Sequence, residues 1–125
     1  MVIVDEKDAP FRIPDPPETR VLKCLLSPEL HPEVTNIGVG ITIMPAASQS
    51  DYIGHDEGEM FYVVSGCGKF KVENGLYDMK PGVMIWVGPH EKHQMINDSD
   101  TTMKILWVLT PPGKEGEILK AAAAR

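Results

Sequence analysis

Glycine and proline divide this chain into short apolar segments. The 125 residues include 11 of each, which exceeds the combined share of about 12% in ordinary proteins. The longest apolar runs have five residues, at 60–64, 83–87 and 105–109, whereas a membrane-spanning helix needs about 20. We therefore expect no membrane insertion. Because 42% of the residues are hydrophobic, the chain is too apolar to stay disordered, and the pattern favours many short strands joined by tight turns.

The clearest strand lies at residues 36–44, NIGVGITIM. Ile37, Val39, Ile41 and Ile43 recur at every second position, which places them on one face of a half-buried strand. The same reasoning predicts further strands at 60–65, 69–73, 83–87, 93–96 and 102–109.

Turn residues separate these strands. Asn74-Gly75 predicts a hairpin in which both residues adopt positive φ. Lys80-Pro81-Gly82 and Gly88-Pro89 predict further turns, and Pro111-Pro112-Gly113 ends the last strand. Only residues 115–124 show a helical pattern. The expected fold class is therefore all-β, an antiparallel sandwich or barrel.

The length predicts one domain. Residues 1–20 contain four prolines, so we expect an extended arm that lies over the surface or reaches a neighbouring subunit. The barrel is predicted at 21–112, with regular structure starting near Val21. Residues 113–125 form a tail, with a short helix that is either mobile or docked.

Net charge and cysteine content limit the kinds of partner and the compartment that we expect for this protein. The formal net charge is −6, so the basic surface that nucleic acid requires is not expected. Cys24 and Cys67 are the two cysteines, and the first residues, MVIVDEKDA, lack the pattern of a signal peptide. We expect reduced thiols and a cytoplasmic protein.

Three polar residues near strand ends suggest a metal site. In an unbroken strand His55 and Glu59 would lie roughly 13 Å apart, so they could share an ion only if the chain bends at 56–58. His93 follows a predicted turn, and two imidazoles with a carboxylate suit non-heme Fe(II), Mn(II), Ni(II) or Zn(II). The alternative is that these side chains are solvated or cap turns, and spacing alone favours it.

Two stretches of the chain resemble the motifs of the cupin superfamily. They are HDEGEMFYVVSG and PGVMIWVGPHEKHQMIN, and the resemblance covers about residues 36–111. It implies a double-stranded β-helix, a jelly-roll-like barrel whose mouth carries the site. It also implies a divalent metal held by His55, Glu59 and His93, and it shifts the balance toward a bound ion.

The sequence departs from the cupin motifs at several positions. Ile53 stands where the first metal histidine of the family would fall, and Gly88 and His90 replace a proline and a glycine of the second motif. Glu57 or His90 could complete the coordination of the ion, or act as a general acid or base.

A closer similarity is to the sensor cupin of bacterial helix-turn-helix regulators. The stretches HDEGEMFYVVSG and ILWVLTPPG carry it. Since the chain has no room for the DNA-binding domain, the similarity implies a free-standing ligand-binding relative.

Two functions are open at this stage. The first is a metalloenzyme, a dioxygenase, decarboxylase, lyase or isomerase, acting on a small oxygenated or carboxylate substrate, with Tyr62 or His90 handling protons. Its cavity would be walled by residues such as Ile53, Phe61, Met84, Trp86, Met95 and Trp107. The second is a non-catalytic module that binds a small-molecule metabolite. We also expect a homodimer, because open-edged small sandwiches often pair.

Overall fold

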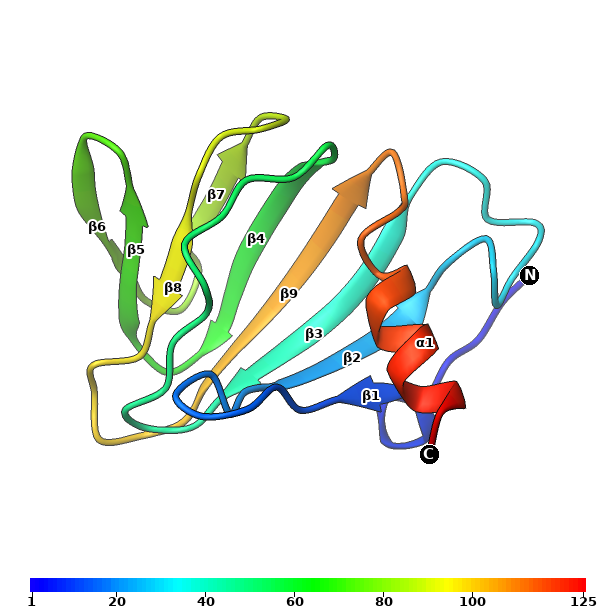
Figure 1. The fold of residues 1–125 in the computed structure, drawn as a ribbon, viewed down its shortest axis with the longest axis horizontal. Coiled ribbons are helices and arrows are strands. Elements are labelled where there is room, and N and C mark those ends of the chain that lie inside the picture. Colours follow the sequence, from blue (N-terminus) through cyan, green and yellow to red (C-terminus); the bar gives the residue numbers. More distant parts are fainter.

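The computed structural model describes all 125 residues as two antiparallel sheets that face each other (Figure 1). The larger sheet has the strand order β1-β2-β3-β9-β4-β7 and the smaller one β6-β5-β8. The strands are β1 (Phe11–Arg12), β2 (Val21–Leu26), β3 (Gly38–Met44), β4 (Gly58–Ser65), β5 (Gly68–Val72), β6 (Gly75–Met79), β7 (Met84–Val87), β8 (Gln94–Ile96) and β9 (Met103–Thr110). A 3-10 helix, η1 (Glu6–Asp8), and an α-helix, α1 (Gly116–Ala123), complete the fold. The all-β prediction is confirmed.

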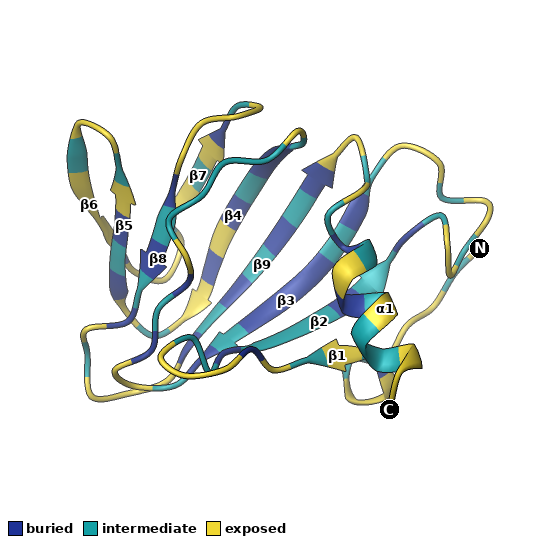
Figure 2. Cartoon of the chain, viewed as in Figure 1, coloured by how far each residue is buried: buried dark blue, intermediate teal, exposed yellow.

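The larger sheet is organised around its central strand, β9. Side chains of β9 alternate between buried and half-buried positions, as expected for a strand with one face on the core (Figure 2). Its inward residues lie in register with those of β4, since Phe61 pairs with Trp107 and Val63 with Ile105. Across the gap between the sheets, Phe61 meets Phe70 of β5 with ring centroids 5.1 Å apart. The core therefore fills the space between the two sheets.

The hairpin between β5 and β6 is confirmed, but its turn differs from the predicted one. Val72 pairs with Gly75, so the two turn residues are Glu73 and Asn74. Positive φ is found instead at Gly82 in the next turn, where φ is 91°. The Asn-Gly pattern located the hairpin, whereas strand register shifted the turn by one residue and removed the need for positive φ.

Both ends of the chain pack on the larger sheet. Regular structure begins earlier than Val21, because β1 pairs with β2 through Phe11 and Lys23. The predicted C-terminal helix is docked rather than mobile, with Ile118 buried against the core. No helix is long and apolar enough to cross a membrane, and no helix-turn-helix unit accompanies the sheets in these 125 residues.

Candidate metal centre

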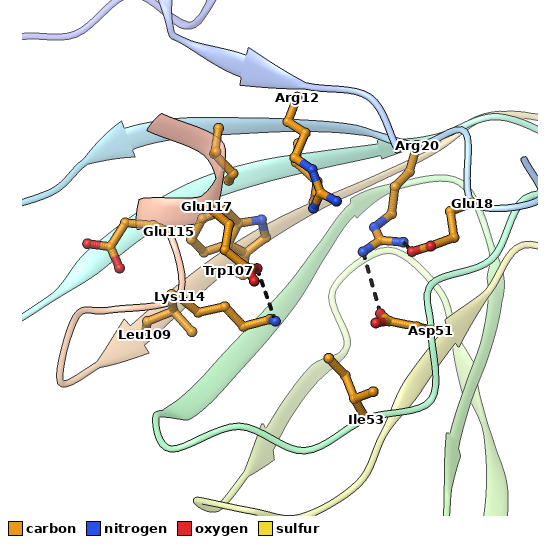
Figure 3. Close-up of a pocket in the computed structure, with 12 residues that line it drawn as sticks. Arg12, Glu18, Arg20, Asp51, Ile53, Trp107, Leu109, Lys114, Glu115 and Glu117 are labelled. Carbon is orange, nitrogen blue, oxygen red and sulfur yellow. Dashed lines mark hydrogen bonds and ion pairs between the residues drawn. The ribbon is translucent and has the colours of Figure 1, made fainter. Parts of the chain in front are cut away.

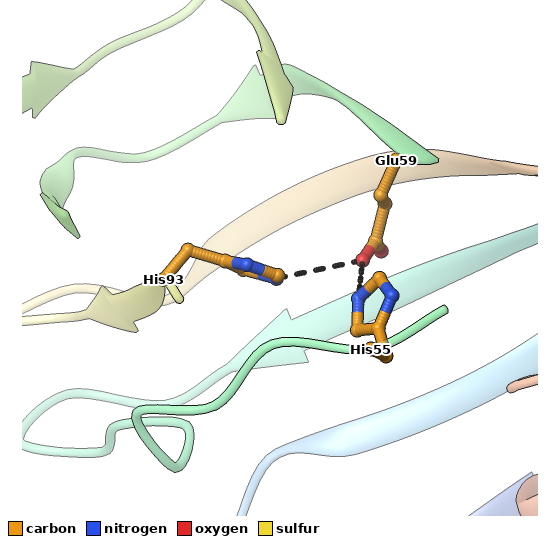
Figure 4. Close-up of side chains that lie close together, drawn as sticks. All are labelled: His55, Glu59 and His93. Carbon is orange, nitrogen blue, oxygen red and sulfur yellow. Dashed lines mark hydrogen bonds and ion pairs between the residues drawn. The ribbon is translucent and has the colours of Figure 1, made fainter. Parts of the chain in front are cut away.

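The chain bends between His55 and Glu59, as their spacing required. Glu59 is the second residue of β4, and its inward position buries the carboxylate. Residues 56–57 form a bend before the strand. The bend brings His55 Nε2 to 2.9 Å from Glu59 Oε1 (Figure 4). The two side chains thus meet although a straight strand would separate them.

His93 approaches the same carboxylate from the opposite sheet. It precedes β8, and its backbone pairs with Ile53 through two hydrogen bonds, of 3.3 and 3.0 Å. Its Nε2 lies 3.6 Å from Glu59 Oε1, and its ring stacks on Phe70 with centroids 5.8 Å apart. The buried aromatic partner fixes the plane of the imidazole.

The ligand atoms of the three residues match the size of a metal site. One atom from each of His55, Glu59 and His93 lies within 4.8 Å of the others. Ligands that bind one ion at about 2.0–2.2 Å lie roughly 3 Å or a little more from each other. The distances from Glu59 Oε1 to the Nε2 atoms of His55 and His93, 2.9 and 3.6 Å, fall in that range.

Backbone carbonyls orient both imidazoles. His55 Nδ1 lies 2.9 Å from the carbonyl oxygen of Glu57, and His93 Nδ1 lies 2.8 Å from that of Glu91. A carbonyl only accepts, so each Nδ1 carries a proton and donates it. When the imidazole is neutral, this leaves Nε2 as the lone-pair atom facing Glu59. Hydrogen bonding of the second ring nitrogen is the usual support of metal-bound histidine, and the residues therefore fit a divalent ion.

Without an ion, the cluster holds a proton. The hydrogen bond to Glu59 raises the pKa of His55 above its ordinary value, against the opposing effect of burial. Burial acts to raise the pKa of Glu59, but hydrogen bonds from His55 and His93 outweigh it and lower that pKa. Both shifts favour the charged forms of the pair, and a bound cation would compete with the proton for His55 Nε2.

The cluster opens into two adjoining cavities. The inner one has a volume of about 60 Å³ and is lined by all three cluster residues together with Arg20, Ile53 and Lys114. The outer one, of about 190 Å³, shares these last three residues and lies under α1 and β1 (Figure 3). A small molecule entering through the outer cavity would reach the three ligand atoms.

Tyr62 and His90 lie away from the cluster. Tyr62 follows Phe61 on β4 and therefore points to the outer face of the sheet, where it is 40% exposed. His90 has an exposed side chain, and its backbone N–H donates to the His55 carbonyl at 2.7 Å. The geometry thus gives no support to a proton-handling role for either residue. His90 does not join the ligand atoms, and Glu57 contributes its backbone carbonyl rather than a ligand oxygen.

The prediction of which residues line the cavity is partly wrong. Ile53, Phe61 and Met95 line the inner cavity, and Trp107 lines the outer one. Met84 and Trp86 are instead 62% and 56% exposed, because β7 turns these two alternate positions outward. An apolar strand pattern alone does not say which face of an edge strand meets the core.

The sequence interpretation missed two basic residues of the site. Arg20 and Lys114 line both cavities, although the first lies in the predicted arm and the second in the predicted tail. No spacing pattern links them, since they come from opposite ends of the chain. A basic residue directly before a strand was the only signal for Arg20.

The chain is similar in sequence to a known protein family and to a known protein. A family model described as a cupin domain matches residues 40–109. The uncharacterized protein MJ1618 of Methanocaldococcus jannaschii is 26% identical over 93 residues, 74% of each chain.

Several solved structures share the fold of this chain. The polyketide cyclase RemF of Streptomyces resistomycificus has a TM-score of 0.77 at 16% identity, covering 90% of this chain and 80% of that one. KdgF of Halomonas sp. has 0.76 at 11%, covering 92% and 99%. A predicted oxalate decarboxylase of Thermotoga maritima has 0.72 at 17%, covering 89% and 100%. At these identities the likeness shows a shared fold.

Proposed function

Because this chain belongs to the cupin family, we propose that it holds one divalent transition metal ion on His55, Glu59 and His93 and uses the ion to bind and transform a small oxygenated molecule. One observation carries the proposal: both histidines are fixed through Nδ1 so that their Nε2 atoms converge on a buried carboxylate. Three protein ligands leave positions for substrate oxygen, as is usual in catalytic rather than structural sites.

Different residues would have different roles at the site. When bound, the ion supplies Lewis-acid polarisation of a carbonyl or carboxylate oxygen. Glu59 balances part of its charge, and its burial keeps that charge from being screened by water. Phe61, Met95 and Ile53 give the inner cavity its apolar walls. Arg20, Asp51 and Lys114 are the other charged side chains that line this cavity and could orient a bound molecule.

Metal binding to the isolated protein tests this proposal. We expect the chelator-treated chain to take up one Mn(II) or Zn(II) per molecule in a calorimetric titration, with uptake weakening in acid because the His55 proton competes. His93→Ala and Glu59→Gln should each weaken binding by about 100-fold or more, since loss of a mere supporting contact already costs about 10–100-fold. At 100 times the dissociation constant, the ion should stabilise the fold by about 2.7 kcal/mol.

A matched histidine variant provides the control. His90→Asn changes a neighbouring imidazole that lies outside the cluster, and asparagine tolerates the positive φ of 66° at this position. It should bind the ion as the unchanged protein does. A chain that binds no ion, or a His93→Ala variant that binds it normally, would refute the proposed metal centre.

A non-catalytic binding module is the second candidate. It is favoured by Ile53, which replaces a fourth ligand, and by the absence of Tyr62 and His90 from the cluster. Turnover by the metal-loaded protein that is lost in Glu59→Gln would exclude this candidate, and ligand binding without turnover would support it.

We also propose that the protein forms a homodimer. Its support is the outer face of β4 and β7, where Tyr62, Val64, Met84 and Trp86 are all exposed, since adjoining exposed apolar side chains often mark an interface. Sedimentation should give twice the 13.8 kDa chain mass, and Trp86→Glu should reduce it to the monomer. A monomer mass for the unchanged protein would exclude the dimer.

A further inference from the structure

Arg20 is a buried, charged side chain that lies beside the candidate metal centre. Arg20 is only 8% exposed, yet it lines both the inner and the outer cavity. Its guanidinium points into the space below β1, toward Asp51 (Figure 3). A charged group this far from water needs hydrogen-bond partners, because burying an unpaired donor is costly.

Hydrogen bonds satisfy only one side of this guanidinium. Nη1 donates to Glu18 Oε1 at 2.6 Å and to the Gln49 carbonyl at 3.5 Å. Nη2 lies 3.8 Å from Asp51 Oδ1, which is too long for a hydrogen bond. Nε is buried and has no partner at all. The Nε–Nη2 edge therefore makes no hydrogen bond within the chain and has only the ion pair of Nη2 with Asp51. This edge is a two-donor fork that matches the two oxygens of a carboxylate.

The inner cavity also has the charge to attract an anion. Its lining contains two cationic side chains, Arg20 and Lys114, and two carboxylates, Asp51 and Glu59, which cancel. A divalent ion on the histidines and Glu59 would leave the cavity net positive. A carboxylate ligand would offset that charge, whereas a neutral ligand would not.

The two cavities limit the size of the ligand. The inner cavity has a volume of about 60 Å³ and the outer one of about 190 Å³, so both suit a small molecule. Ile53 and Leu22 line both spaces and form an apolar wall along the path. The ligand is therefore a short molecule with a polar group at each end.

We propose that the site takes a short-chain oxygenated carboxylic acid, whose carboxylate binds the Nε–Nη2 edge of Arg20 while its second oxygen function reaches the ion held by His55, Glu59 and His93. The inference rests on the proposed function and specifies its substrate class. Lys114 strengthens the binding as a second cation. The nearby carboxylates of Glu18 and Asp51 disfavour a dianion, so the site should discriminate against phosphate.

Binding of pyruvate tests the proposal, because pyruvate carries a carboxylate and a carbonyl in a small frame. Calorimetric titration of the Mn(II)-loaded protein should show pyruvate binding at least 10-fold tighter than neutral hydroxyacetone or inorganic phosphate. Arg20→Lys keeps the charge but loses the fork, so it should weaken pyruvate binding by roughly 10-fold or more. Lys114→Gln should weaken it less, by about 3-fold.

Control variants distinguish failure of the carboxylate site from failure of the proposed metal centre. Arg125→Lys and Lys120→Gln change an exposed arginine and an exposed lysine that lie outside both cavities, and they should leave pyruvate binding unchanged. Arg20→Lys should still bind Mn(II) within about 2-fold and unfold at a similar temperature, which excludes misfolding. If the unchanged chain binds no metal but still loses pyruvate in Arg20→Lys, the metal centre fails and the carboxylate site stands. Equal pyruvate binding by Arg20→Lys, or tighter binding of phosphate or hydroxyacetone, overturns the carboxylate assignment.

Discussion

Replacing Ile53 by histidine should add a fourth ligand to the candidate metal centre. Ile53 and His93 are directly opposite each other and exchange two backbone hydrogen bonds, so their side chains leave the ladder on the same face about 5 Å apart. Ile53 also lines the inner cavity. An imidazole at this position would therefore lie beside the ion rather than in the core.

The histidine at position 53 should tighten zinc binding by the energy of one ligand less the cost of placing it. Four-ligand zinc sites in small domains bind with about 10–16 kcal/mol, or about 2.5–4 kcal/mol per ligand. Ile53 is half-buried, so losing its apolar contacts costs about 1 kcal/mol, and ordering the new imidazole costs about another 1 kcal/mol. The remaining gain of about 0.5–2 kcal/mol corresponds to binding that is tighter by about 2–30-fold.

Competition with a chelator of known affinity measures this change for Zn(II). Ile43→His is the matched control, because Ile43 is also a half-buried isoleucine but lies on β3 outside both cavities. It should bind the ion as the unchanged chain does. Equal affinity of Ile53→His and Ile43→His would show that residue 53 does not face the ion, and the register argument would be wrong.

Three further predictions concern the rest of the molecule. A thiol reagent at neutral pH should label exposed Cys67 at once but Cys24 only after denaturation, because burial raises the pKa of Cys24 to about 12; mass spectrometry that finds both labelled in the native chain would contradict this. Thr42→Val should cost about 1–3 kcal/mol in denaturant unfolding, since it leaves the buried Trp107 Nε1–H, now 2.9 Å from Thr42 Oγ1, without an acceptor; unchanged stability would show that the bond is unimportant. The hydrogen bond from Lys104 of β9 lowers the pKa of Glu6, so the stabilisation of the fold by this pair is present above pH 4.5 and is lost as the pH falls through the lowered pKa. Glu6→Gln should therefore lower the free energy of unfolding by about 0.5 kcal/mol at pH 7 and leave it unchanged near pH 2. A difference in stability that does not depend on pH would exclude this cause.

The three residues of the candidate metal centre were only partly predictable, because spacing alone favoured solvated side chains and the resemblance to cupins shifted the balance toward an ion. His55 and Glu59 needed a bend between them, and the polar, glycine-containing loop between them supplied one. His93 was expected to reach the site through a second hairpin, but β7 and β8 lie in different sheets, so His93 approaches Glu59 from the opposite sheet. The roles of Tyr62 and His90 were less predictable, because the direction of a side chain depends on strand register and backbone φ.

The chain by itself determined the features that depend on near neighbours. Glycine and proline marked where strands end. The alternation along β3 identified a strand but not its core face, because Gly38, Gly40, Thr42 and Met44 are buried opposite the core residues of β9, whereas Val39 and Ile43 are half-buried. Only the tertiary structure decided what distant segments build together. It brought Arg20 and Lys114, from the two ends of the chain, to the cavity beside Glu59, and it turned Trp86 outward. Local periodicity cannot report such contacts, because they arise from packing the termini and the second sheet against strands far away in the sequence.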